Sequence, residues 1–390
     1  MRLVLATSDF KIHGLAVAGF PILLEDDMQI SEPANSFLIE VCITNGGARS
    51  QASWAKYGQD IYDFLGFAGA KGVDYWRTIP RRGRPGPIEM YRNWALDEGG
   101  CSPSTVNQRL RTIRRFYDWC VREQIIDRAP YRTIPVRNSR DTQFLQHVDA
   151  TGNRVETPHF MLKVLKKPLK ILSKAQCDEC LKALQDNEAL QLLFRLMLVT
   201  GLRNREARTL PDAYVFNPAR ISRLQGKAFT RLGLDASEMC LKGSKDREID
   251  VPVQLMQDLY WWSVKQRPKR IRCNAQGQAQ LKELFITERG NAYSQNAIGD
   301  MFRALSRRVG YPVTPHMLRH TWATHTLHFL RRSNLRGDPL LYVQARLGHA
   351  SLNTTIIYLH HLEHMDVELL ESHNNELDML FSGSVEGLTV

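Results

Sequence analysis

Apolar residues recur at helical spacing along most of this chain, and the pattern predicts a mainly helical protein. Between residues 50 and 67 the apolar side chains follow a period near that of an α-helix. Ser102 can cap a further helix, and Pro103 suits its first turn. The apolar stripe of this helix consists of Val106, Leu110, Ile113, Tyr117 and Cys120.

The second half of the chain mixes helices with a small sheet. Ser173 and Gln176 form a capping box that predicts a helix start. Residues 192–199 are almost wholly apolar, so we expect a buried helix that Gly201 ends in a left-handed turn. Residues 238–242 and 247–251 predict a hairpin, and residues 284–286 are a candidate third strand. The predicted fold class is mainly α with a small antiparallel β-sheet.

The length of 390 residues allows more than one hydrophobic core. Turn-rich and basic stretches divide the chain, and we expect five segments. These are an N-terminal accessory segment over 1–48, a helical domain over 49–137, a basic linker over 138–172, a mixed α/β domain over 173–365 and a C-terminal tail over 366–390.

The formal net charge is +11, which favours a polyanionic partner, most simply nucleic acid. A solvated basic surface is the alternative that charge alone leaves open. The candidate contacts to nucleic acid lie in a loop rich in proline and glycine, on the helix after Ser102 and in the linker. They are Arg81, Arg82, Arg109, Arg111, Arg115, Arg122, Lys166 and Lys167.

Seven cysteines, an odd number scattered over a long chain, argue for reduced thiols. Cys177 and Cys180 form a C-x-x-C pair without a second pair at a suitable spacing, and they fall on an apolar helical stripe. We therefore expect these two residues to be core cysteines and not metal ligands, and we expect the protein to have no cofactor. Because no stretch is apolar and long enough to span a bilayer, we expect a cytoplasmic protein.

Three short segments near the C-terminal end carry the candidate chemistry. Residues 200–206 contain Arg203, residues 316–321 contain His316 and Arg319, and residues 347–349 end in His349, with Tyr358 nine positions on. Each residue alone has an ordinary structural explanation. As an ordered set of cations, proton carriers and a phenol, they suit a phosphodiester, whose attack builds negative charge on oxygen.

Further side chains can support this set. Glu206 follows Arg203 by three positions and can pair with its guanidinium group. Lys242 and Lys245 flank the predicted hairpin turn, where a mobile lysine can donate a proton, and His320 directly follows Arg319.

These segments resemble the signature boxes of the tyrosine recombinases, the phage integrase family. The resemblance covers residues 173 to about 364 and extends more weakly over residues 50–135, where residues 105–110 are similar to the helical core-binding domain of that family. It implies a helical core-binding domain, a mixed α/β catalytic domain, double-stranded DNA as partner and a homotetramer on two recombination sites. Accessory proteins also fit the family, and the C-terminal tail either docks on a neighbouring protomer, as in relatives, or packs on its own domain.

The resemblance implies a role for each residue of the set. Tyr358 would attack the scissile phosphate and form a 3′-phosphotyrosyl link, while Arg203 and Arg319 hold the non-bridging oxygens. Lys242 would protonate the leaving 5′-oxygen, with Lys245 as its substitute. A free phenol has a pKa of about 10, and we expect the neighbouring cations to favour the phenolate.

The histidines would complete the site. His316 would assist proton transfer and His349 would hydrogen-bond the phosphate, while Glu206 and His320 support their neighbours. The reaction would need neither metal nor ATP. The alternatives are a type IB topoisomerase, a non-catalytic DNA-binding protein on the same fold and a metal-dependent nuclease or transposase.

Overall fold

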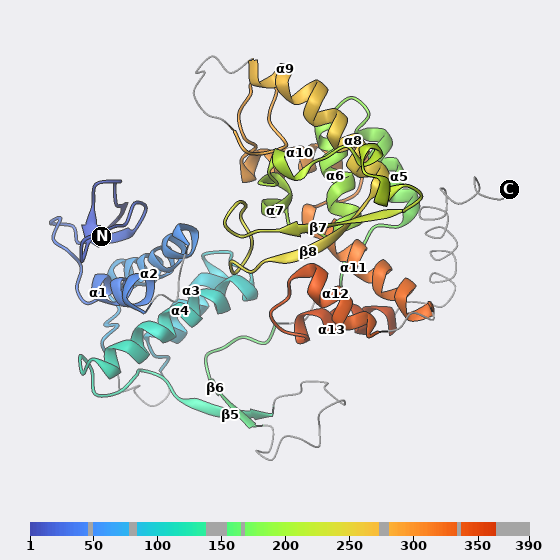
Figure 1. Cartoon of the computed structure of the whole chain (residues 1–390). Coiled ribbons are helices and arrows are strands. Elements are labelled where there is room, and N and C mark those ends of the chain that lie inside the picture. Colours follow the sequence, from blue (N-terminus) through green and yellow to red (C-terminus); the bar gives the residue numbers. More distant parts are fainter. Residues whose placement is uncertain are drawn as a thin grey trace. The chain divides into compact units, whose positions relative to one another are not determined.

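The computed structural model describes residues 1–45, 50–77, 84–137, 154–164, 168–272, 281–333 and 337–363. The chain divides into two compact units, residues 1–166 and residues 167–390. Helices dominate both units, and the sheets of the described residues are small, two-stranded and antiparallel (Figure 1). The predicted fold class is therefore confirmed.

The N-terminal unit begins with short strands and continues with helices. Its strands are β1 (Arg2–Leu5), β2 (Lys11–Ile12), β3 (Leu15–Ala16), β4 (Pro21–Leu24), β5 (Thr133–Arg137) and β6 (Arg154–Pro158). Its helices are α1 (Ala34–Ile39), the π-helical turn η1 (Glu40–Thr44), α2 (Gln51–Lys71), α3 (Pro87–Asp97) and α4 (Pro103–Arg122). The strands pair as β1 with β4, β2 with β3 and β5 with β6.

One apolar core holds the N-terminal unit together. The Ser102 side chain caps α4 by accepting a hydrogen bond from Thr105 N, as its position in the sequence predicts. The predicted stripe of α4 is fully buried, and the Phe116 ring lies 5.5 Å from that of Phe37 in α1. Residues 1–45 thus contribute side chains to the same core as α2 and α4.

The C-terminal unit is larger and is also mainly helical. Its helices are α5 (Lys174–Ala183), α6 (Glu188–Thr200), α7 (Asn204–Arg208), α8 (Val253–Trp261), α9 (Arg267–Arg272), α10 (Gln295–Val309), α11 (Pro315–Arg332), α12 (Pro339–Leu347) and α13 (Asn353–Glu363). Short turns are η3 (Asp212–Tyr214), η4 (Pro218–Arg220), η5 (Ser222–Leu224) and η6 (Trp262–Gln266), and its strands are β7 (Phe229–Leu234) and β8 (Arg247–Pro252).

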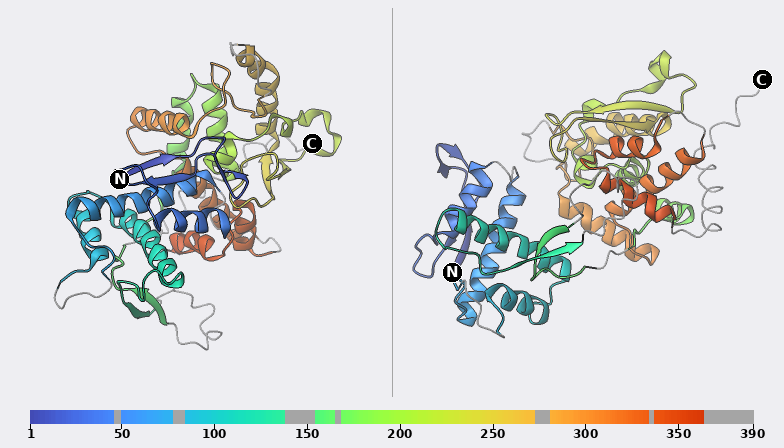
Figure 2. Two further views of the ribbon diagram at one scale, coloured as in Figure 1. Left: turned by 90° about the vertical axis from the view of Figure 1, so that its left-hand side faces the viewer. Right: turned by 90° about the horizontal axis from the view of Figure 1, so that it is seen from below.

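Helix α11 occupies the middle of this unit and packs against α6, α12 and α13 (Figure 2). The capping box of Ser173 and Gln176 starts α5, and Gly201 ends α6 with a φ of 66°, both as predicted. Cys177 and Cys180 are buried free thiols in the core of the unit, which confirms their structural role. No described helix combines the length and apolar content that crossing a membrane requires.

The predicted hairpin has a different first strand. Strand β8 pairs in antiparallel register with β7, from Phe229 opposite Pro252 to Leu234 opposite Arg247, and residues 235–246 connect them. The predicted strand over 238–242 is wrong. These residues form a loop in which Met239 and Leu241 are buried, and this gives the same alternation of buried and exposed positions as a strand. Residues 284–286 form no strand either; all three are buried, and only Ile286 makes an isolated bridge.

Candidate active site

The C-terminal end of α12 gathers both arginines of the predicted set. The Leu347 carbonyl accepts hydrogen bonds from Arg319 Nη2 at 2.7 Å and from Arg203 Nη1 at 3.2 Å. Gly348 follows in the left-handed conformation with a φ of 63° and turns the chain toward His349. Carbonyls at a helix end lack partners within the helix and carry partial negative charge, so cationic donors are well placed there.

Arg319 is almost completely buried, at 1% exposure. Its Nη1 donates to the Gly201 carbonyl at 2.7 Å, so the left-handed end of α6 and the end of α12 hold the same guanidinium group. Burial and the nearby Arg203 lower the pKa of Arg319 to about 9, which still leaves it charged at neutral pH.

The carboxylate of Glu206 links Arg203 to a third arginine. Arg203 donates to it from its backbone N and from Nη1, both at 2.8 Å, so the expected pairing of these residues is present. Arg247, the first residue of β8, donates to the same carboxylate from Nη2 at 2.6 Å and from Nη1 at 3.2 Å. Burial by itself would raise the pKa of Glu206, but the two guanidinium groups outweigh it and keep that pKa below its ordinary value.

Two of the three site histidines belong to α11. The rings of His316 and His320 lie 4.1 Å apart, and His320 Nδ1 is 3.1 Å from the hydroxyl oxygen of Tyr358. His349 Nδ1 lies 2.9 Å from Thr355 Oγ1, and the His349 ring stacks on Tyr358 at a centroid distance of 6.3 Å. The structure therefore brings the phenol and all three imidazoles into one cluster.

These imidazoles are neutral at pH 7. Burial, followed by neighbouring charge, lowers the pKa of His320 to about 4 and that of His349 to about 3. The pKa of His316 is also lowered, by burial and then by Arg319, Arg203 and Lys242. A neutral imidazole can accept a proton, and it can donate a hydrogen bond from its other nitrogen.

The hydroxyl-bearing Tyr358 is buried within α13, at 1% exposure. Burial raises its pKa, although Arg319 and Arg203 act in the opposite direction. The two arginines therefore favour the phenolate, as expected, but the loss of solvent has the larger effect, so the net pKa of Tyr358 is raised in this conformation.

The two candidate lysines are exposed in the 235–246 connection. Lys242 is close enough to His316 and His349 for its charge to lower the pKa of both.

The predicted contacts to nucleic acid differ in what they touch. Arg81, Arg82, Lys166 and Lys167 lie outside the described residues. Arg109 is partly buried and forms an ion pair with Asp63, and Arg122 pairs with Glu40 and Glu123.

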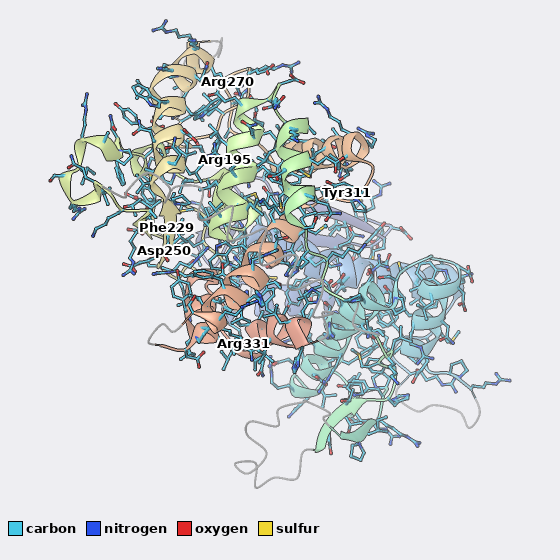
Figure 3. The ribbon with its side chains drawn as sticks, turned by 90° about the vertical axis from the view of Figure 1, so that its right-hand side faces the viewer. Arg195, Phe229, Asp250, Arg270, Tyr311 and Arg331 are labelled. Atoms are coloured by element: carbon cyan, nitrogen blue, oxygen red, sulfur yellow. The ribbon has the colours of Figure 1, made fainter. Side chains whose placement is uncertain are left out.

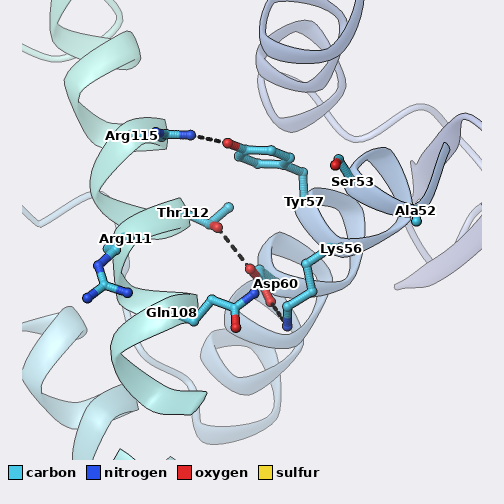
Figure 4. A pocket seen from close by; sticks show the side chains of 9 residues that line it. All are labelled: Ala52, Ser53, Lys56, Tyr57, Asp60, Gln108, Arg111, Thr112 and Arg115. Atoms are coloured by element: carbon cyan, nitrogen blue, oxygen red, sulfur yellow. Dashed lines mark hydrogen bonds and ion pairs between the residues drawn. The ribbon is translucent and has the colours of Figure 1, made fainter. Parts of the chain in front are cut away.

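Arg111 and Arg115 of α4 are exposed, as Arg122 is, but among the described residues they take part in no ion pair with an acidic side chain. They line a hollow between α2 and α4 together with Lys56 and Tyr57, and the Arg115 guanidinium contacts the Tyr57 hydroxyl (Figure 4). Behind them, the buried Asp60 accepts hydrogen bonds from Lys56 Nζ and from a hydroxyl group of α4. The hollow is thus lined by cationic groups on a fixed helical base.

Sequence reasoning missed Arg247. It is a single arginine at the start of a strand, and no spacing or local pattern distinguishes it from the other arginines of the chain. In the part of the chain that the structure describes, no group of three or more His, Cys, Asp or Glu side chains is arranged to hold a metal ion.

Comparison with known proteins gives one consistent family. The sequence profile described as the phage integrase family matches residues 170–365. The chain is 28% identical over 262 residues to tyrosine recombinase XerD of Lacticaseibacillus casei, which covers 66% of this chain and 73% of that protein. It is 23% identical over 309 residues to tyrosine recombinase XerC of Bacillus pumilus, which covers 78% of this chain and 84% of the relative.

Solved structures show a similar fold. The XerH site-specific recombinase bound to palindromic difH substrate, in a post-cleavage complex, matches with a TM-score of 0.52 at 18% identity, over 89% of this chain and 84% of that one. The Tn1549 transposon integrase in complex with a circular intermediate DNA matches with a TM-score of 0.51 at 17% identity, over 89% and 100%.

Proposed function

Because the chain belongs to the phage integrase family and is a tyrosine recombinase, we propose that it cuts and rejoins double-stranded DNA at specific sites through a 3′-phosphotyrosyl intermediate. The observation that carries this proposal is the convergence of Arg203, Arg319, His349 and Tyr358 at the end of α12. The proposal includes a homotetramer acting on two duplexes.

In the proposed cleavage step, Tyr358 Oη attacks the scissile phosphorus. A bond forms between Oη and phosphorus, and the bond from phosphorus to the 5′-oxygen breaks. The phenol proton passes to a neutral imidazole, and His320 lies at hydrogen-bond distance from Oη. Lys242 gives a proton to the leaving 5′-oxygen, so proton balance is kept.

Arg203 and Arg319 take the role of clamps on the non-bridging oxygens. Both are held by backbone carbonyls and, for Arg203, by Glu206, so their orientation is set before the phosphate arrives. Preorganised donors of this kind stabilise charge that develops in the transition state. The phosphotyrosyl link keeps the energy of the phosphodiester, and a 5′-hydroxyl can reverse the step without ATP.

Tyr358 has to become exposed before it can react with DNA. At 1% exposure the hydroxyl cannot reach a phosphate, so DNA binding has to uncover it by a shift of α13. The hydrogen bond to His320 and the stacking on His349 are the contacts that such a shift breaks or rearranges.

The direct test is a covalent adduct. The purified protein is incubated with a library of nicked duplexes of random sequence, and complexes that survive SDS are recovered and sequenced. We expect the wild type to yield adducts on a defined sequence and Tyr358→Phe to bind the same duplex without forming any.

Adduct formation by Tyr358→Phe would show that Tyr358 is not the nucleophile. Binding without adduct by the wild type would favour a non-catalytic DNA-binding protein. Relaxation of supercoiled plasmid at a dilution where only monomers are present would favour a type IB topoisomerase, and loss of activity in EDTA a metal-dependent enzyme.

The lysine assignment has its own test. Lys242→Ala should slow cleavage by about 10²–10⁴-fold on an ordinary substrate, because it removes the proposed general acid. On a duplex with sulfur as the 5′ bridging atom, the rate should return toward that of the wild type, since a thiolate leaves without a proton. Lys245→Ala is the matched control; rescue of that variant instead would reassign the acid.

A further inference from the structure

Arg247 begins strand β8, but its side chain contacts the candidate active site. Its side chain is only 7% exposed, and its guanidinium group spans both oxygens of Glu206. Its Nε donates to the Arg346 carbonyl at 3.0 Å, next to the Leu347 carbonyl that holds Arg203 and Arg319. One guanidinium group thus ties the start of β8 to α7 and to the end of α12.

The aliphatic part of Arg247 also packs against the turn that presents His349. A Cβ atom added at Gly348 would lie 2.9 Å from Cδ of Arg247, closer than ordinary packing permits. The Arg247 side chain is therefore packed closely against the left-handed turn at Gly348, and neither can move without displacing the other.

The effect on Arg203 follows from the sharing of one carboxylate. Within the described ranges, the hydrogen bonds of the Arg203 guanidinium all start from Nη1, and Nη2 and Nε make none. Arg247 donates hydrogen bonds to both oxygens of Glu206 and so weakens the ion pair between Glu206 and the Arg203 guanidinium group. Without Arg247, the buried carboxylate would turn toward Arg203 as its one remaining cation and compete with a phosphate for it.

We propose that Arg247 is a positioning residue for the strand cleavage proposed above: it sets the Arg203 clamp through Glu206 and fixes the turn that carries His349. The inference rests on the proposed function. At 7% exposure, with its guanidinium group bonded to Glu206 and to the Arg346 carbonyl, Arg247 would act through these neighbours and not on the DNA itself.

The chain offers a matched control in Arg346. Its side chain is 11% exposed, and its Nε forms an ion pair with Asp250 at 2.6 Å (Asp250 is labelled on β8 in Figure 3), so burial and pairing resemble those of Arg247. Its guanidinium group, however, does not contact Glu206. Arg346→Lys should therefore leave cleavage unchanged even if it lowers the melting temperature.

The test compares Arg247→Met, Arg247→Lys and Arg346→Lys on the nicked duplex recovered as an adduct. We expect Arg247→Met to bind this duplex as the wild type does and to cleave it about 100-fold more slowly in a single turnover. Arg247→Lys should be intermediate, because an ammonium group cannot span both carboxylate oxygens and the Arg346 carbonyl together.

A substrate with reduced charge distinguishes a positioning role of Arg247 from a merely structural one, because a structural defect would slow cleavage of both substrates equally. A methylphosphonate at the scissile position lacks one anionic oxygen and depends less on the Arg203 clamp. The defect of Arg247→Met should shrink to less than about tenfold on this duplex. Equal defects on both duplexes, or equal losses in Arg346→Lys, would overturn the proposal.

A crystal structure of Arg247→Met separates this inference from the proposed function. We expect Arg203 to leave the Leu347 carbonyl and the turn at Gly348 to shift. An unchanged Arg203 and an unchanged turn would refute the positioning role, whereas a wild type without any adduct would refute the function instead. If Arg247→Met does not fold, Arg247→Lys, which keeps a positive charge beside the buried Glu206, provides the same measurements.

Discussion

At the scale of single residues, the site consists of buried charges that are compensated in advance. Glu206 and Arg319 are each 1% exposed, and each is held by at least two partners of opposite charge or dipole. Removing one partner from a buried ion pair costs about 3–5 kcal/mol of stability, because the other charge stays desolvated. The same arrangement that orients the proposed clamp therefore makes this part of the fold sensitive to substitution.

The neutral histidines predict an acid sensitivity that starts above the range of the carboxylates. A solvated histidine has a pKa of 6.5, whereas His320 and His349 have values of about 4 and about 3 in the folded chain. Their contribution to stability is complete above pH 6.5 and decreases as pH falls. Below this pH the histidines of the unfolded chain bind protons, whereas those of the folded chain stay neutral. Glu206, with a pKa held below 4.5, adds its loss only at lower pH.

Thermal unfolding followed from pH 7.5 to about 4.5 checks this. The melting temperature of the wild type should fall over that range, and His349→Gln should show a weaker pH dependence, by about one proton or 1.4 kcal/mol per pH unit. Identical pH dependence of the two proteins would mean that His349 is not held neutral by the fold.

At the scale of secondary structure elements, helix ends position the candidate catalytic side chains. Gly201 ends α6 and Gly348 ends α12, both in the left-handed conformation, and each is followed within two residues by a residue of the site. The last carbonyls of these helices accept hydrogen bonds from Arg319 and Arg203, so the polar ends of the helices hold the two arginines of the proposed clamp.

Gly201→Ala should be much more damaging than an ordinary substitution at a helix end. Its Cβ would lie 2.7 Å from Trp322 and 2.9 Å from Leu347, and the φ of 66° is unfavourable for alanine. The conformational cost is about 1–2 kcal/mol, and the crowding adds about 1–3 kcal/mol. The free energy of unfolding, measured by denaturant titration, gives the sum.

Gly310→Ala is the matched control for this comparison. Gly310 ends α10 in the same unit with a φ of 80°, and a Cβ added there has no heavy atom within 4 Å. It should show the conformational cost alone. Equal destabilisation by both substitutions would mean that contact with Trp322 and Leu347 is not what requires glycine at position 201.

At the scale of the whole molecule, positive charge is spread over both units. Residues 1–166 carry a formal net charge of +4 and residues 167–390 one of +7. Residues 363–390 alone contribute −7, so the rest of the C-terminal unit is strongly basic. Such a distribution suits contact with DNA from both units.

DNA affinity should accordingly be steeply salt-dependent. For about six to ten phosphate contacts, it should fall by about 10³–10⁵-fold between roughly 50 and 200 mM salt. Replacing both Arg111 and Arg115 by Gln should reduce the slope of log affinity against log salt by about two, measured by fluorescence anisotropy.

Arg195→Gln serves as the control, because Arg195 pairs with Asp258 at 2.7 Å. An unchanged slope in the double variant would place the DNA contacts outside the hollow between α2 and α4.

The sequence was sufficient for features that depend on local chemistry. Caps, left-handed glycines and apolar stripes follow from interactions within a few positions, and Ser102, Ser173 and Gly201 occupy the predicted roles. The strand predicted over 238–242 failed because burial of Met239 and Leu241 from a loop produces the same alternation as a strand. Local pattern cannot separate these two cases.

The residues of the candidate site could be selected from sequence because their types and order are unusual, but their charge states could not. Which groups share a carboxylate or a carbonyl, and which lose solvent, depends on distant neighbours such as Arg203 and Leu347, which are 144 positions apart. Only the tertiary structure therefore assigned Arg247 to Glu206, joined His320 to Tyr358 and made burial outweigh the arginines in setting the pKa of that phenol.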